Sequence, residues 1–317
     1  MDTRHLVDPE VWPIVDLLPF PKFDRATLHL ARADAAARLA DMPGPPLAAT
    51  VRTAQRADGS TIELYHFDPK PGAQGQAALY HVHGGGMILG TAKDMQVGPS
   101  AMAVALQVPV ISVEYRLAPE ISFPGPQHDC LDGLAWLAAH AGELGIDPAR
   151  IAVIGESAGG GLAAATALMA RDTGGPSLAA QVLVYPMLDH RTGGDDCCWK
   201  NRSTGEFLWN RASNRFGWDA LRGDYPADDA RKGWFSPALA EDLSGLPPTL
   251  LLTGSLDLFF DEDLDYARRL VDAGVPVELH SYPGAIHAFN MMAEAAISQA
   301  FARDMMAGIA RLLKLGS

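Results

Sequence analysis

The chain has 317 residues, of which 48% are hydrophobic and 20% charged, a composition typical of a soluble globular protein. Its 25 basic and 38 acidic side chains give a formal net charge of −13, which disfavours nucleic acid and anionic membranes as partners, because phosphate binding needs a basic face. It shows no continuous apolar window of membrane-spanning length and no apolar core of signal-peptide type, so we expect no membrane partner and a cytoplasmic location.

The first 45 residues predict two helices followed by a break in the chain. Residues 9–20 and 24–40 favour helix, the second segment because it is rich in alanine, leucine and arginine. Proline and glycine in the segment 41–48 then interrupt the helical pattern. Beyond it, two strand-like runs flank Asp58-Gly59, a dipeptide that is typical of a β-hairpin turn.

From residue 76 onward, short apolar runs alternate with helical stretches. Continuous runs rich in β-branched residues are typical of strands buried on both faces of a parallel sheet. The apolar runs are 76–83, 108–115, 150–157, 179–186, 248–255 and 275–282. The helical stretches are 126–144, 157–173, 261–273 and 293–314. This alternation predicts βαβ units and a doubly wound α/β sheet with helices on both faces.

The segment between residues 190 and 247 is too long for a plain crossover between two strands. It is rich in tryptophan, phenylalanine and arginine, and it contains a helix candidate at 206–222. We interpret it as an insertion that folds over the sheet and forms a lid with the N-terminal helices. The predicted organisation is N-terminal cap helices at 1–45, a core in two parts at 46–189 and 236–317, and an inserted cap at 190–235.

The three cysteines are Cys130, Cys197 and Cys198. Their number is odd and two of them are adjacent, so no disulfide framework can be read from their spacing. No CxxC pair or paired histidine spacing accompanies them, which argues against a zinc site. We therefore expect free thiols in a reducing compartment.

The strongest local motif is G-x-S-x-G at residues 155–159, directly after a predicted strand and directly before a predicted helix. In that context a sharp, strained turn exposes a serine hydroxyl at the carboxyl end of a sheet. The helix N-terminus behind the turn favours developing negative charge. Ser157 is therefore the candidate nucleophile.

A serine hydroxyl is a weak nucleophile and needs a base, and in this topology the order along the chain is serine, acid, histidine. Of the ten histidines, only His287 lies in a loop between the last predicted strand and a helix, so it is the candidate base. Asp257 comes nearest to the end of the strand at 248–255 and is the candidate acid. Asp261 and Asp263 remain nearby alternatives, although both positions are typical of a helix N-terminus.

Three successive glycines, Gly84, Gly85 and Gly86, follow the predicted strand at 76–83. Glycine loses more backbone freedom on folding than any other residue, so a run of three needs a reason. Acyl transfer builds an oxyanion, which backbone N–H groups stabilise. We assign these donors to Gly85, Gly86 and Ala158, with Gly84 shaping the loop. We expect alanine at Gly85 or Gly86 to reduce turnover far more than stability.

The polar residues around the glycines are interpreted as structural. We expect His81 to pack within its strand, and His83 to anchor the glycine loop by hydrogen bonding without transferring a proton. Tyr115 and Arg116 follow a strand end, and Asp129 lies in the following helical stretch. We expect a pair between Arg116 and the Asp129 carboxylate to lock the loop.

Four motifs, taken in this order, resemble those of the hormone-sensitive-lipase-like esterases of the α/β-hydrolase fold. They are HGGG at 83–86, YRLAPE at 115–120 with Phe123-Pro124 and Asp129, GESAGG at 155–160, and LDLFFDE at 256–262 leading to YPGAIHAF at 282–289. The resemblance implies a mostly parallel, eight-stranded twisted sheet under a helical cap. It also implies a Ser157–Asp257–His287 triad and, because such dimers are common in the family, a possible homodimer through the last strand.

Four positions depart from that family pattern. The family usually has a DPLRDE run where this chain has Leu258 and Phe260 in place of the proline and the arginine. Ala288 follows the histidine where glycine is usual, and Glu156 stands where aspartate is frequent. We therefore expect differences in the ion pairs near Phe260 and in the pocket beside Ala288.

Together these residues predict a serine carboxylesterase that hydrolyses short- to medium-chain acyl esters through an acyl-enzyme, with no metal and no cofactor. An amidase or a specialised natural-product acyl-hydrolase with the same triad stays open. A non-catalytic small-molecule receptor or a lyase of the same fold is disfavoured, because Ser157 and His287 are both present. Candidate pocket walls are Met87, Met187, Trp209 and Phe216, with Trp12 and Phe207 as further candidates.

Overall fold

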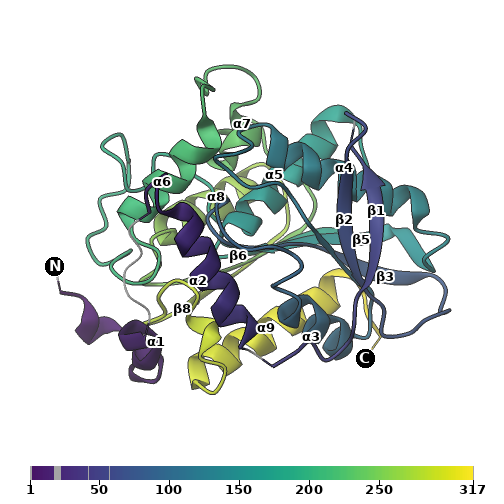
Figure 1. The fold of residues 1–317 in the computed structure, drawn as a ribbon, viewed down its shortest axis with the longest axis horizontal. Coiled ribbons are helices and arrows are strands. Elements are labelled where there is room, and N and C mark those ends of the chain that lie inside the picture. Colours follow the sequence, from purple (N-terminus) through teal and green to yellow (C-terminus); the bar gives the residue numbers. More distant parts are fainter. Residues whose placement is uncertain (1, 18–22, 42, 57, 317) are drawn as a thin grey trace.

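The computed structural model describes residues 2–17, 23–41, 43–56 and 58–316 (Figure 1). The strands in this part of the chain are β1 Thr50–Gln55, β2 Thr61–Phe67, β3 Gln76–Val82, β4 Val110–Val113, β5 Ile146–Glu156, β6 Ala180–Val184, β7 Thr249–Gly254 and β8 Val277–Tyr282. They form one sheet in the order β1-β2-β4-β3-β5-β6-β7-β8. β2 pairs antiparallel with β1 and β4, and all other neighbours pair parallel. The predicted mostly parallel, eight-stranded sheet is confirmed.

Helices cover both faces of the sheet (Figure 1). In the described residues they are α1 Trp12–Leu17, α2 Leu28–Ala40, α3 Val97–Leu106, α4 Gly125–His140, α5 Ala158–Thr173, α6 Arg211–Arg222, α7 Lys232–Phe235, α8 Phe260–Asp272 and α9 Ala296–Leu312. None of these helices is long and apolar enough to cross a membrane.

Two hydrophobic cores follow from the alternation of side chains along the strands. In β3, Tyr80 and Val82 pack into the core beneath α4, α5 and α8, whereas Ala77 and Leu79 pack into the core beneath α3 and α9. Because both faces are covered, β3, β4, β6 and β7 are almost wholly buried. This is why their sequences read as continuous apolar runs.

The helix boundaries differ from the prediction where polar side chains cap a turn. The Asp24 carboxylate accepts hydrogen bonds from the backbone N–H groups of Ala26 and Thr27. These bonds hold the chain in a turn, so α2 begins only at Leu28. Asn210 accepts from Ala212 N at 2.9 Å and Ser213 N at 3.0 Å and so starts α6 at Arg211, not at 206.

Two further helices differ from the expected pattern. The helix expected at 9–20 is a 3₁₀ turn over Pro9–Val11 followed by α1, and residues 18–20 lie outside the described part. α3 lies outside the predicted elements, since Gly98 and Pro99 resemble a break. Both residues occupy its first turn, where proline is tolerated.

The carboxyl ends of four parallel strands bring the predicted site residues to one edge of the sheet. The glycine loop follows β3, and Ser157 follows β5. Asp257 follows β7 and His287 follows β8, two strands that lie on the other side of β5 from β3. Residues that are far apart in the chain therefore meet where ligands bind in open α/β sheets.

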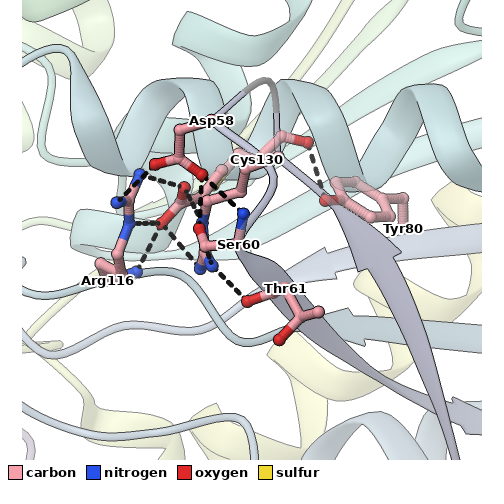
Figure 2. Close-up of polar contacts among 8 residues, drawn as sticks. Asp58, Ser60, Thr61, Tyr80, Arg116 and Cys130 are labelled. Carbon is pink, nitrogen blue, oxygen red and sulfur yellow. Dashed lines mark hydrogen bonds and ion pairs between the residues drawn. The ribbon is translucent and has the colours of Figure 1, made fainter.

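The hairpin of β1 and β2 is attached to the core by a buried ion-pair network (Figure 2). Asp129 on α4 is fully buried and accepts from Arg116 Nε at 2.8 Å and from Arg56 Nε at 2.6 Å. Asp58 in the hairpin turn lies 3.8 Å from Arg116 NH1 and is mostly exposed. The expected pair of Arg116 with Asp129 is thus present, and Arg56 makes it a triad of charges.

Asp129→Asn is expected to lower the free energy of unfolding by about 3 kcal/mol, because it leaves two arginines without their buried counter-charge. Asp58→Asn is the matched control, since an exposed pair of this kind contributes about 0–1 kcal/mol. Urea unfolding monitored by circular dichroism measures both variants. Equal, small losses would show that the network does not stabilise the hairpin.

Candidate active site

Ser157 sits on a strained turn between β5 and α5. Its φ is 56° and its ψ is −121°, a conformation that L-residues rarely adopt. A Cβ at Gly155 would lie 2.2 Å from Gly159 O, and one at Gly159 would lie 2.0 Å from Val82 O. The chain can make this turn only with glycine at both flanking positions, as the G-x-S-x-G motif predicts.

Ser157, His287 and Asp257 form a continuous hydrogen-bonded row. Ser157 Oγ lies 2.9 Å from His287 Nε2, and His287 Nδ1 lies 2.7 Å from Asp257 Oδ2. When the imidazole is neutral with its hydrogen on Nδ1, that N–H donates a hydrogen bond to the carboxylate. Nε2 then accepts a hydrogen bond from the serine hydroxyl. All three side chains are buried, and Asp257 Oδ1 also accepts from Phe259 N at 3.0 Å.

The two alternative acids occupy other places. Asp263 is fully buried and accepts from Thr253 Oγ1 at 2.5 Å, and burial raises the pKa of its carboxyl well above the usual range. Asp261 is half-buried in the first turn of α8, where burial raises its pKa. Neither carboxylate bonds to His287 in the described structure, so only Asp257 continues the row.

Aromatic rings surround the imidazole of His287. Tyr185 and Phe259 present their edges to it at centroid distances of 4.9 and 5.3 Å, and Trp209 lies 6.5 Å away. Tyr185 is held by donating from its hydroxyl to Asn290 Oδ1 at 2.9 Å. These contacts restrict the ring to the orientation that serves both Ser157 and Asp257.

The glycine loop packs directly against the nucleophile. A Cβ at Gly84 would lie 3.0 Å from Glu156 O and 3.6 Å from Ser157 Cβ. Gly85 and Gly86 have φ values of 116° and 62°, which favour glycine. Gly85 O accepts from Ile88 N and Leu89 N, whereas the described residues offer no acceptor for Gly85 N–H or Gly86 N–H. These two donors and Ala158 N–H are available to an oxyanion.

Alanine would not separate turnover from stability at these two glycines, contrary to the sequence expectation. A Cβ at Gly85 would lie 2.1 Å from Leu89 O, a backbone atom. A Cβ at Gly86 would lie 2.1 Å from Cη2 of Trp209. Both substitutions strain the fold as well as the loop.

The two histidines before the glycines have different partners. His83 Nδ1 lies 2.8 Å from Gly84 O, and its ring stacks on Tyr115 at 4.2 Å. Burial lowers the pKa of His83 to about 4, so it is neutral at pH 7 and anchors the loop. His81 does more than pack, because its Nε2 lies 3.1 Å from the Glu156 carboxylate and its Nδ1 lies 2.8 Å from Ser112 Oγ.

A profile of the α/β-hydrolase fold family matches residues 79–291. The chain belongs to this family. The order of Ser157, Asp257 and His287 along this α/β-hydrolase is the order that a serine, acid and histidine triad has in this sheet topology.

Carboxylesterase NlhH of Mycobacterium tuberculosis is 34% identical to this α/β-hydrolase over 306 residues, which cover 90% of this chain and 89% of that protein. Ethyl acetate hydrolase of Pseudomonas putida is 37% identical over 242 residues, covering 74% of this chain and 73% of that protein. A solved structure of a bacterial heroin esterase aligns with a TM-score of 0.89 and 40% identity, over 99% of this chain and 100% of that one. The predicted membership among hormone-sensitive-lipase-like esterases is confirmed.

Three of the predicted pocket-wall residues are linked by contacts that begin at Gly86. Trp209 rests on Gly86, and the Met187 side chain approaches the same place from the segment after β6. Phe216 joins them through Phe23, whose ring centroid is 6.0 Å from that of Phe216 and 5.9 Å from that of Trp209.

The other wall candidates are less directly placed. The Met87 side chain is fully buried in the core of this α/β-hydrolase, and Phe207 is buried in the core cluster that also holds Tyr185. Trp12 is exposed and packs beneath the Arg4 guanidinium.

Some residues that shape the site carry no signal in the sequence. Gly217 on α6 is one, because a Cβ there would lie 2.7 Å from Gly86 O. Asn214 is another, because its side chain accepts from Trp209 Nε1 at 3.1 Å and donates to Thr192 O at 2.7 Å. Both depend on how α6 packs on the glycine loop, which no local motif encodes.

Asp257→Asn is expected to lower kcat on the order of 10⁴-fold, because an amide cannot stabilise the imidazolium and favours the wrong tautomer of His287. Asp261→Asn should leave kcat close to the wild-type value. Steady-state kinetics on p-nitrophenyl acetate measure both variants. The reverse ranking would transfer the role of the acid to Asp261.

Proposed function

We propose that this chain is a serine carboxylic ester hydrolase in which Ser157 is the nucleophile, His287 the general base and Asp257 the group that orients it. The observation that carries the proposal is the unbroken row from Ser157 Oγ through His287 to Asp257, at 2.9 and 2.7 Å, beside the free N–H groups of the glycine loop. Relatives whose names are carboxylesterase and ethyl acetate hydrolase, matched over most of this chain, support the reaction class.

The reaction proceeds in two steps. Ser157 attacks the ester carbonyl while His287 Nε2 takes its proton, and the oxyanion accepts from Gly85 N–H, Gly86 N–H and Ala158 N–H. The imidazolium then gives its proton to the leaving alcohol, which leaves an acyl-enzyme. Water repeats the cycle on the acyl carbonyl and releases the acid. Asp257 stays ionised throughout and stabilises the imidazolium.

The wall beside the oxyanion donors favours short acyl groups. Trp209 rests on Gly86, and a hydrogen bond to the buried Asn214 holds its indole in place. Met187 and Gly217 close the space behind it, since a Cβ at Gly217 would lie 3.6 Å from Met187 Cε. The acyl chain must fit between these side chains and the reacting carbonyl, so acetyl and propionyl groups fit better than long chains.

A homodimer through β8 is the second part of the proposal. β8 ends the sheet and pairs only with β7 in the described structure, so its outer edge offers unpaired backbone groups. Leu279 on this strand is 41% exposed. Light scattering coupled to size exclusion measures the mass, and a monomer at micromolar concentration would contradict the dimer.

We place the protein in a reducing compartment, the cytoplasm. Cys130, Cys197 and Cys198 are all free thiols in the structure, although the last two are adjacent in the chain. Cell fractionation with an antibody against the protein tests this location directly.

Ser157→Ala is expected to lower kcat/KM by at least about 10⁴-fold on p-nitrophenyl acetate, butyrate and octanoate, because no other group replaces the nucleophile. Its thermal unfolding temperature should match that of the wild type, since only a hydroxyl is removed. Activity retained by a correctly folded variant would contradict the proposed triad.

Trp209→Leu is expected to raise the ratio of kcat/KM for octanoate to that for acetate by about tenfold or more, because it frees volume beside the acyl chain. Trp234→Leu, at a tryptophan on α7 whose Nε1 donates to the Asp172 carboxylate at 2.7 Å, is the matched control. Trp209→Phe should shift the ratio less. An unchanged acyl profile with an altered preference among alkyl acetates would assign Trp209 to the alcohol side.

A further inference from the structure

The cap contains a cavity of about 580 Å³ that is separate from the catalytic row. It is lined by residues of the segment 192–204, by Arg211 at the start of α6, and by Leu258 and Asp261. The volume lies within the range of small-molecule sites in proteins, which is about 300–1,000 Å³. Neither Ser157, His287 nor the glycine loop lines it, although Leu258 directly follows Asp257.

The charge on the cavity wall is opposite to that of the whole protein. Lys200, Arg202 and Arg211 line it, against a single carboxylate, Asp261. In the described part of the chain, no carboxylate oxygen lies within 4.0 Å of any of these three cations. A cationic concavity in a chain with a net charge of −13 marks a place where an anion is attracted locally.

Two of these cations are held in place by neutral groups. Lys200 Nζ donates to Cys197 O at 2.8 Å. Arg211 donates to Thr204 O at 2.7 Å and to Asn201 O at 2.8 Å. These carbonyl oxygens position the side chains without neutralising them, so the positive charge remains available to a ligand.

The cavity wall also has an apolar part. The indole of Trp199 and the side chain of Leu258 are among the residues that line the cavity. The indole Nε1–H itself is buried away from the open space of the cavity, so Trp199 offers a ligand apolar surface.

We propose that the cap cavity binds a small organic carboxylate with an apolar body. The carboxylate faces Lys200, Arg202 and Arg211, and the apolar part lies against Trp199 and Leu258. The carboxylate can come from two sources. It can be part of the alcohol portion of the ester substrate, or it can belong to a separate molecule bound beside the loop that carries Asp257. Both sources need the same cations, so one set of variants tests the site and a second measurement separates the sources.

Isothermal titration calorimetry on the full-length protein tests the site with benzoate and with its neutral isostere benzamide. Benzoate should bind at least about tenfold more tightly than benzamide, and the Lys200→Met/Arg202→Met double variant should abolish this difference. Lys232→Met is the matched control, because Lys232 pairs with Glu241 and does not line the cavity. Arg211 is left intact because it ties two wall segments together.

The proposal is overturned if benzoate and benzamide bind alike, or if the double variant binds benzoate as the wild type does. The titration needs no turnover, so this failure is distinct from a failure of the proposed ester hydrolysis. Kinetics on 4-acetoxybenzoate and its methyl ester then identify the source. A wild-type preference for the anionic ester that the double variant loses assigns the site to the substrate, and benzoate binding without that preference assigns it to a separate ligand.

Discussion

The site depends on how closely the start of α5 approaches the ends of β3 and β5. No side chain fits at Gly155 or Gly159, because the backbone of one segment occupies the place of a Cβ on the other. This contact forces Ser157 into its strained conformation and brings Ala158 N–H to the same edge as the glycine loop. Backbone packing therefore holds Ser157, Ala158 N–H and the glycine loop together, which is the preorganisation that the proposed nucleophile and oxyanion donors need.

The segment 188–192, which leads from β6 into the predicted cap, is attached to α8 by a buried carboxylate. Glu262 on α8 accepts from Leu188 N at 2.7 Å, from Asp189 N at 3.2 Å and from the Thr192 hydroxyl. Burial, followed by the nearby charge of Asp189, raises the pKa of the Glu262 carboxyl well above its usual range. One side chain thus joins residues 188–192 to the helix that follows Asp257.

A second attachment holds α2, one of the predicted cap helices, against the core. Arg32 on α2 donates to Ile88 O at 2.8 Å and to Ala118 O at 2.9 Å, both in loops that follow sheet strands. It also forms a bidentate pair with Glu120 of the YRLAPE motif. Through Ile88, α2 is therefore tied to the loop that carries the proposed oxyanion donors Gly85 and Gly86.

The sequence was sufficient for features that depend on local rules. Apolar periodicity predicts the parallel strands, and the G-x-S-x-G turn predicts Ser157 between a strand and a helix. Contacts between distant segments could not be predicted from the sequence. Examples are the packing of Trp209 on Gly86, the hydrogen bond between His81 and Glu156, and the packing of Gly217 on the glycine loop. α3 was missed for a local reason, because Gly98 and Pro99 are compatible with a break and with a first helical turn.

The contact of α6 with the glycine loop limits how this enzyme can be re-engineered. Gly217 brings the helix so close that its neighbour across the interface is the carbonyl of Gly86 itself. A larger side chain at position 217 would press on this carbonyl and shift the backbone next to the Gly86 N–H, which is the proposed oxyanion donor. Substitutions on this face of α6 are therefore expected to change the reaction rate together with the acyl preference.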